Sequence, residues 1–347
     1  MFALQNSFQN FLDASYTGWK RDDAILSESL EDLADKVPGI LKNSRSANTS
    51  KAYHAAFHRW ETWISEYSEA SAVPASPTFV ILYLTHLSIN VKSFASISQF
   101  LSSLTWFHNL QGHASPVRDP VVVEVVSGLK RQLACPTVRK EPFSVENIKC
   151  LYKTMNLSSL TDIRNTTMIV LAFVAFLRFD EVTHIMVKDI VFKETHLELA
   201  IPKAKTDQLR QGNTVVIAST GSDTCPVRLL SLYMKVAEIN KSKRDPSFLF
   251  TRVIFKNKKL QLFPTGKPMT YTNVRDIVKK KAQQIGLNPN DFATHSMRSG
   301  GPTAAAEAGV DERLMQKHGR WAQASSKDKY VVDALQKRLD VSKVLLK

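Results

Sequence analysis

Hydrophobic residues between positions 45 and 133 recur with the period of an amphipathic helix. The first stripe consists of Tyr53, Phe57, Trp60 and Ile64, which lie on one helical face. Further stripes lie over residues 78–87, 97–107 and 121–129. Ser76 and Asp119 are each followed by proline, a pair typical of a helix start. Four amphipathic helices joined by short loops predict a small helical bundle.

The pattern changes after residues 135–142, a polar stretch that carries a proline near each end. We interpret this stretch as an interdomain linker. Ser144 is expected to cap the next helix. The most apolar run of the chain predicts a buried helix over residues 162–177, which ends at Arg178.

Short alternating runs rich in branched residues follow this helix. They predict strands over residues 187–192, 197–201, 214–218 and 248–250. Another helix is expected to start at Pro226, and the remainder is expected to be helical, with C-terminal caps at Gly286 and Gly309. The patterns therefore predict a mostly α-helical chain whose second part is α+β, with a small antiparallel sheet.

We accordingly divide the chain into four parts. They are an N-terminal arm over residues 1–44, partly helical or disordered, a helical domain over 45–134, the linker 135–142 and a mixed domain over 143–347. A length of 347 residues is typical of two domains.

Composition narrows the class of protein. With 44% hydrophobic and 22% charged residues, global disorder is excluded. The three cysteines lie far apart, which excludes a disulfide scaffold and argues against a zinc site. No apolar run reaches the roughly 18–20 residues of a membrane span, so we expect no membrane partner.

Charge points to a polyanionic partner. The chain carries a net charge of +14. Residues 1–140 hold 13 basic and 12 acidic side chains, whereas residues 141–347 hold 33 and 20. A folded domain with such a basic excess is typical of proteins that bind nucleic acid.

Several residues of the second part could act on a phosphate, although each has an ordinary structural explanation when taken alone. They are Arg178 with Glu181, Lys203, Lys205, His295, Arg298, Trp321 and Tyr330. Arginine binds two phosphate oxygens at once, and such donors stabilise the charge of a five-coordinate phosphorus transition state. The sequence has no Gly-rich phosphate loop and no paired metal-binding carboxylates, so we expect no cofactor and no metal.

The order and spacing of these residues resemble the tyrosine recombinase (phage integrase) family over about residues 45–347. The family pattern is an arginine with a glutamate three residues later, a hairpin lysine, H-x-x-R, a glycine shortly before His or Trp, and a tyrosine nine residues further on. The matching positions here are Arg178 and Glu181, Lys205, His295 and Arg298, Gly319-Arg320-Trp321, and Tyr330. Trp321 stands where many members carry histidine, and Lys203 competes with Lys205 for the lysine position.

The resemblance implies a helical, SAM-like core-binding domain followed by an α+β catalytic domain, which together clamp double-stranded DNA. It implies that Tyr330 attacks the scissile phosphate and forms a 3′-phosphotyrosyl bond. Lys205 would protonate the leaving oxygen, His295 would assist proton transfer, and Arg178, Arg298 and Trp321 would bind the phosphate. Glu181 would orient Arg178.

Other DNA contacts are expected outside the phosphate site. Lys203 and the run Lys279, Lys280 and Lys281 are candidates, although the run is equally typical of a solvated helix face. Gly300 and Gly301 either permit a close approach of the backbone to DNA or weaken their helix.

The tail of the chain most resembles recombinases of DIRS, Ngaro or Crypton mobile elements. A eukaryotic origin would imply a nuclear location, and otherwise the protein would be cytoplasmic or nucleoid-associated. The family resemblance implies a homotetramer on DNA that is a monomer or dimer off DNA. The alternatives are a domesticated DNA-binding protein without turnover, a type IB topoisomerase, and a basic protein whose motif matches are accidental.

Overall fold

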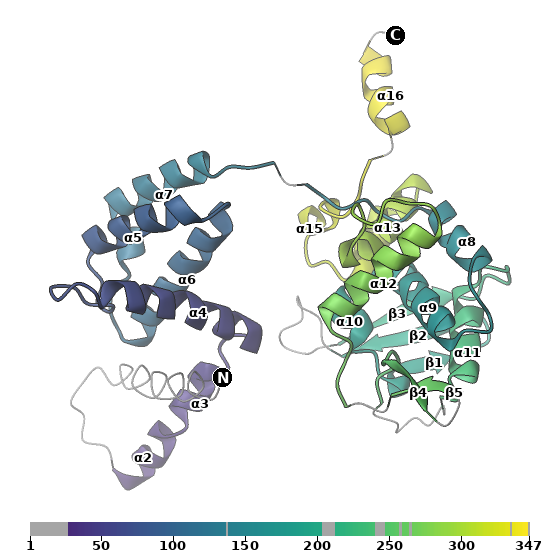
Figure 1. Cartoon of the computed structure of the whole chain (residues 1–347), viewed down its shortest axis with the longest axis horizontal. Helices are drawn as coiled ribbons and strands as arrows, with labels where there is room; N and C mark the ends of the chain where they lie inside the picture. The colour runs from purple at the N-terminus through teal and green to yellow at the C-terminus, as the bar shows by residue number, and fades with distance from the viewer. Residues whose placement is uncertain are drawn as a thin grey trace. The chain divides into compact units, whose positions relative to one another are not determined.

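The computed structural model describes residues 27–136, 138–202, 212–239, 247–256, 259–263, 266–333 and 335–345 (Figure 1). The chain divides into two compact units, unit 1 over residues 1–137 and unit 2 over residues 138–347. Within the described ranges, no helix combines the length and the apolar character needed to cross a membrane.

Unit 1 is helical throughout its described part. Its elements are α2 (Glu28–Ala34), α3 (Val37–Lys42), α4 (Ala47–Ile64), α5 (Pro77–Asn90), α6 (Phe94–Leu110), the 3₁₀ turn η2 (Pro116–Arg118) and α7 (Pro120–Gln132). Asp119 caps α7 by accepting bonds from two backbone N–H groups. Aromatic side chains fill the core, where Trp60 and Phe107 are fully buried.

Unit 2 combines helices with two small antiparallel sheets. Its first elements are α8 (Val145–Lys153), α9 (Leu160–Val174), α10 (Phe179–Thr183), η3 (Val187–Asp189), β1 (Ile190–Phe192), β2 (His196–Ile201), β3 (Asn213–Ala218) and α11 (Pro226–Val236). The later ones are β4 (Val253–Lys256), β5 (Lys259–Leu262), α12 (Tyr271–Gln284), α13 (Thr294–Glu307), α14 (Glu312–Gly319), α15 (Ala324–Asp328) and α16 (Leu335–Leu345). The sheets have the strand orders β1-β2-β3 and β4-β5. The prediction of a mostly helical chain with small antiparallel sheets is confirmed.

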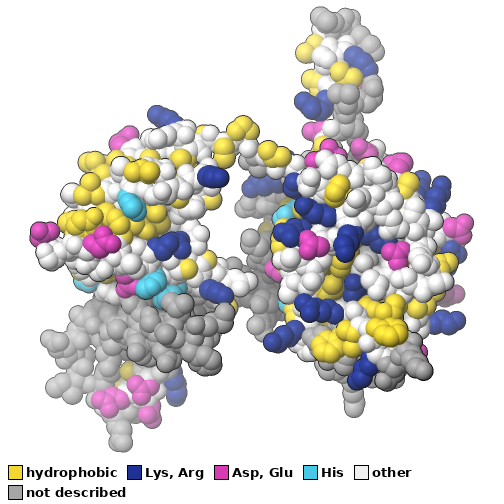
Figure 2. Space-filling model, viewed as in Figure 1, with side chains coloured by type: hydrophobic (Ala, Val, Ile, Leu, Met, Phe, Trp, Pro, Cys, Tyr) yellow, Lys and Arg dark blue, Asp and Glu magenta, His cyan; other side chains and the backbone are white. Residues whose placement is uncertain are grey.

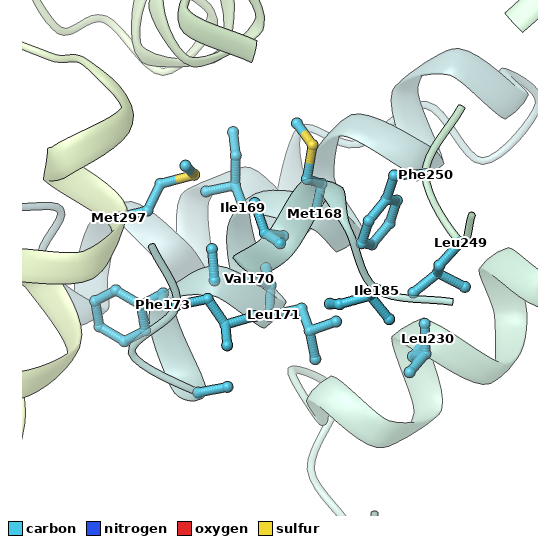
Figure 3. Packing of buried hydrophobic residues seen from close by; sticks show 14 of the residues in the cluster. Met168, Ile169, Val170, Leu171, Phe173, Ile185, Leu230, Leu249, Phe250 and Met297 are labelled. Carbon is cyan, nitrogen blue, oxygen red and sulfur yellow. The ribbon is translucent and has the colours of Figure 1, made fainter. Parts of the chain in front are cut away.

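Helix α9 forms the centre of unit 2. Met168 and Ile169 have no exposed surface, and the neighbouring residues of α9 are almost as deeply buried. They pack against Leu230 of α11 and Met297 of α13 (Figure 3). Ala175 and Phe176, which follow α9 directly, are buried as well.

Three local predictions were wrong. The helix formed by the apolar run ends at Val174. Arg178 is therefore the N-cap residue of the following helix α10 and does not end α9. Residues 187–189 form a 3₁₀ turn before β1, and residues 248–250 contribute one isolated bridge, between Met186 and Phe248, instead of a strand. The β4-β5 hairpin was missed because its strands have only four residues each.

Gly300 and Gly301 have a packing role on the buried side of α13. A Cβ atom at Gly300 would collide with the carbonyl oxygen of Phe143, and one at Gly301 with that of Phe173. Gly301 therefore lets α13 approach the backbone of α9, and Gly300 lets it approach the backbone of the segment before α8. The sequence analysis offered a close approach to DNA or a weakened helix as the reason for these glycines. Neither explanation includes this packing contact within the protein.

Candidate active site around Glu181

The site begins where α9 ends in a left-handed turn. Phe176 has a φ of 49°, and the N–H of Leu177 donates to the carbonyl oxygen of Ala172 at 2.9 Å. This bond closes a Schellman motif, which usually carries glycine at the left-handed position. The turn redirects the chain so that Arg178 becomes the N-cap residue of α10.

Glu181 then closes the first turn of α10. Its Oε2 accepts a bond from the backbone N–H of Arg178 at 2.8 Å, and its Oε1 accepts one from the Arg178 guanidinium at 2.8 Å. The three-residue spacing seen in the sequence thus places both groups on one carboxylate. The side chain of Glu181 is 2% exposed and that of Arg178 is 16% exposed.

Helix α14 ends in the same way at Arg320. This residue has a φ of 57°, and the N–H of Trp321 donates to the carbonyl oxygen of Gln316 at 3.1 Å. The preceding Gly319 is needed because a Cβ atom there would collide with the ring of Trp321. The left-handed conformation costs a residue other than glycine about 1–2 kcal/mol.

Three arginines surround the carboxylate of Glu181. Besides the bond from Arg178, its Oε2 receives Nη2 of Arg320 at 2.8 Å and lies 3.5 Å from Nη1 of Arg298. The side chains of Arg298 and Arg320 are 1% and 3% exposed. We name Arg178, Glu181, Arg298 and Arg320 the arginine cluster. Three guanidinium groups and one carboxylate leave it with an excess of positive charge.

The carbonyl groups at the end of α9 accept bonds from the same arginines. The oxygen of Phe176 accepts one from Arg298 and one, at 3.2 Å, from Arg320. The oxygen of Ala175 accepts a bond from Arg320 at 3.2 Å. The orphan carbonyls of the helix end are therefore satisfied by side chains from α13 and from the end of α14.

The end of α14 is attached to the cluster from the other side. The oxygen of Gly319 accepts a bond from Arg298 at 3.0 Å, and that of His318 accepts one from Arg320 at 2.8 Å. The His318 ring also hydrogen-bonds to the carbonyl oxygen of Val174 at 2.8 Å. Each buried guanidinium thus joins the two helix ends.

The cluster shifts the pKa values of Glu181 and Arg298. Burial alone would raise the pKa of Glu181, but Arg320, Arg298 and the N–H of Arg178 outweigh it and hold the pKa below its usual value. Burial, followed by the charge of Arg178, lowers the pKa of Arg298 to about 10. Glu181 and Arg298 therefore both remain charged at neutral pH.

Tyr330 lies directly over the cluster. Its ring centroid is 4.8 Å from the guanidinium carbon of Arg298 and 5.6 Å from the ring of Trp321, and it stacks at 6.4 Å on the ring of His295. His295 is exposed whereas Arg298 is buried. The structure therefore brings together all the predicted site residues that lie in its described part, apart from the α12 lysines.

Two buried donors lie beneath the Tyr330 ring. Neither Nε of Arg298 nor Nε1 of Trp321 has a hydrogen-bond acceptor within the described residues. The guanidinium carbon of Arg298 lies 4.9 Å from the Trp321 ring. Since an unpaired buried donor is costly, an acceptor that reached these two donors would be bound favourably.

The predicted DNA-binding lysines have different surroundings. Lys203 and Lys205 lie outside the described residues. Lys280 is exposed and Lys279 half-buried on α12. Lys and Arg side chains lie over the face of unit 2 on which α12 is seen in the same view (Figure 2). The prediction that Lys281 contacts DNA was wrong. Its side chain is 2% exposed, and its Nζ lies 2.6 Å from a carboxylate oxygen of Asp162.

Sequence reasoning missed Arg320 as a member of the site. Arg320 lies between Gly319 and Trp321 of the family motif. Its left-handed backbone conformation, which glycine usually adopts, could not be read from an arginine in the sequence. The described residues contain no group of three or more His, Cys, Asp or Glu side chains placed to hold a metal ion.

Comparison with known proteins identifies the family. The sequence pattern described as "Phage integrase family" matches residues 142–337, and the chain therefore belongs to the phage integrase family of tyrosine recombinases. An integrase/recombinase XerD homolog of Selenomonas ruminantium is 26% identical over 308 residues, which are 88% of this chain and 87% of that protein. The tyrosine recombinase XerD of Staphylococcus aureus is 22% identical over 280 residues, 80% of this chain and 84% of the relative.

Solved structures share the fold at lower identity. A post-cleavage complex of the XerH site-specific recombinase with palindromic difH substrate has a TM-score of 0.59 at 16% identity, over 93% of this chain and 86% of that one. The Tn1549 transposon integrase in complex with circular intermediate DNA has a TM-score of 0.50 at 13% identity, over 97% and 99%.

Proposed function

We propose that this protein is a site-specific DNA recombinase or integrase that cleaves and rejoins strands through a 3′-phosphotyrosyl intermediate. The observation that carries the proposal is the position of the Tyr330 ring, 4.8 Å from the guanidinium carbon of Arg298 above a positively charged cluster. Family membership supports the reaction class, and the relatives named above are recombinases.

The chemistry assigns a role to each group. Oη of Tyr330 attacks the scissile phosphorus, a phosphotyrosyl bond forms, and the bond to the 5′-oxygen breaks. His295, stacked on Tyr330, takes the phenolic proton, and Lys205 gives a proton to the leaving oxygen. The phosphodiester bond energy is conserved in the intermediate, so rejoining needs no nucleotide cofactor.

The arginine cluster would stabilise the transition state. Arg178 and Arg298 bind the non-bridging oxygens, Trp321 donates its unpaired indole N–H, and Glu181 orients Arg178. The surplus positive charge of the cluster matches the additional negative charge of a five-coordinate phosphorus. Guanidinium groups supply this charge without a metal ion, which is the basis for proposing a metal-independent reaction.

The remaining assignments rest on the family pattern. Unit 1 would be the SAM-like core-binding domain and residues 135–142 the linker to the catalytic domain. Lys203, Lys279 and Lys280 would contact DNA, and the protein would act as a homotetramer on two DNA sites. The tail motifs favour a DIRS, Ngaro or Crypton origin, and hence a nuclear location.

The test is a covalent trap on nicked duplex DNA. The parent protein, Tyr330→Phe and the control Tyr271→Phe are incubated with nicked duplexes from the DNA that flanks the gene and from a random library. Tyr271 is a suitable control because it is 47% exposed on α12 of the same unit. Denaturing gels should show a protein–DNA band for the parent and the control and none for Tyr330→Phe.

The other outcomes separate the alternatives. A band that persists in Tyr330→Phe would refute the nucleophile. Absence of any band, with salt-dependent DNA binding intact, would favour a domesticated DNA-binding protein. Relaxation of supercoiled DNA without recombinant products would favour a topoisomerase.

A further inference from the structure

Arg320 occupies a backbone conformation that normally selects glycine. Its φ of 57° compares with 80° at Gly286 and 75° at Gly309, which end other helices of the same unit in the same kind of turn. A glycine at position 320 would form the turn without strain. Strain of this kind at a functional site points to a role for the side chain.

The side chain of Arg320 is directed into the protein. Nη2 donates to Glu181 at 2.8 Å, and Nη1 donates to the carbonyl oxygen of His318, also at 2.8 Å. Further bonds reach the carbonyl oxygens of Ala175 and Phe176, each at 3.2 Å. One planar guanidinium therefore ties the ends of α9 and α14 to the carboxylate on α10.

The guanidinium above which Tyr330 lies is that of Arg298. Arg298 shares the acceptor at Phe176 and the carboxylate of Glu181 with Arg320. A change in Arg320 would therefore reach the reacting groups through these shared acceptors.

We propose that Arg320 is a positioning residue for the cleavage reaction. It holds Oε2 of Glu181 in place, which leaves Oε1 to orient Arg178 and fixes the acceptors that orient Arg298. This inference rests on the proposed function. It adds to the site a residue that acts through Glu181 rather than on the phosphate.

The expected effect follows from the geometry. Without Arg320, the carboxylate of Glu181 can turn toward Arg298 and Arg178, and both guanidinium groups shift. A misplacement of about 1 Å costs roughly 100-fold in rate. Affinity for DNA should change little, because the Arg320 side chain is 3% exposed and both its Nη groups donate to protein acceptors.

The first arm of the experiment is a double-mutant cycle on single-turnover cleavage, measured with the full-length protein on the nicked duplex. Arg320→Gln should slow cleavage roughly 100-fold while the dissociation constant for DNA stays within about twofold. In a protein that already carries Glu181→Gln, the substitution Arg320→Gln should slow cleavage by less than about a further threefold, because the two residues act as a unit.

Two further variants control for charge. Arg320→Lys should not restore the rate, since one ammonium group cannot span the four acceptors that the guanidinium fork reaches. Arg313→Gln removes an arginine from an exposed position of α14 and should leave the rate unchanged.

The second arm needs no catalysis. Nε–Hε signals of ¹⁵N-labelled arginine report the surroundings of Arg178 and Arg298, and Arg178→Lys and Arg298→Lys assign them. Both signals should shift in Arg320→Gln and stay in place in Arg313→Gln. The inference would be overturned if the Arg178 and Arg298 signals stay in place in Arg320→Gln. It would also be overturned if Arg320→Gln slows cleavage equally in the parent and in the Glu181→Gln protein. If the parent protein cleaves no substrate, the proposed function fails and this inference fails with it, whereas cleavage by the parent together with unmoved signals overturns the inference alone.

Discussion

Removal of the negative charge of Glu181 should strongly destabilise unit 2. Glu181→Gln keeps the shape of the side chain but leaves three guanidinium groups without their carboxylate. Two of the ion pairs have N–O distances of 2.8 Å, the third is 3.5 Å, and the Glu181 side chain is 2% exposed. Removing one partner of a buried ion pair costs about 3–5 kcal/mol, and we expect a loss in this range.

The loss should depend on pH in a defined direction. The ordinary pKa of the glutamate is 4.5, and in the folded protein it is lower. The charge of Glu181 therefore contributes stability above pH 4.5, and this contribution is lost as the pH falls through the folded value. The difference between the parent and Glu181→Gln should be largest near pH 7 and shrink in acid.

The assay is urea unfolding of the full chain followed by far-UV circular dichroism. Hydrogen exchange of peptides from α9, resolved by mass spectrometry, reports the stability of unit 2 by itself. Glu198→Gln is the matched control, because its side chain is 36% exposed and lies 3.9 Å from Lys193. An exposed pair of this kind contributes about 0–1 kcal/mol. Equal, small losses for Glu181→Gln and Glu198→Gln would refute the reasoning.

Further predictions concern packing and charge in the same chain. Gly301→Ala should lower the free energy of unfolding by about 1–3 kcal/mol in urea titrations, because its Cβ atom has no space, whereas Gly128→Ala, in open space on α7, should not destabilise. Lys281→Met should reduce stability by removing the cationic partner of Asp162, and should not alter the salt dependence of DNA binding. Lys280→Gln should reduce the slope of log affinity against log salt by about 0.9, and an unchanged slope would remove Lys280 from the DNA contacts.

The amphipathic stripes predicted most helix positions because burial of one face is a local periodic property. The stripe through Tyr53, Phe57 and Trp60 corresponds to α4. The stripe that begins at Val121 lies within α7, but Val121 is 59% exposed and its neighbour Val122 is buried. The two glycines expected at helix ends, Gly286 and Gly309, have the positive φ of such caps.

Helix ends without glycine were not predictable from local sequence. Phe176, Glu238 and Arg320 all adopt positive φ, although their side chains disfavour it. At Phe176, Arg298 and Arg320 donate to the carbonyl oxygens of Phe176 and Ala175. At the end of α14, Arg298 donates to the carbonyl oxygen of Gly319. Partners distant in the sequence supply these bonds, so only the folded chain reveals them.

The sequence by itself determined the family, the order of the chemical groups and the pairing of Arg178 with Glu181, because these depend on residue identity and short spacing. The tertiary structure decided which charges face inward. It buried Lys281 against Asp162 and left Lys280 exposed one residue earlier. It also added Arg320 to the cluster, since the ends of α9 and α14 become neighbours only when both helices pack in unit 2. Long-range packing determines the cost of burying a charge and the groups available to compensate it.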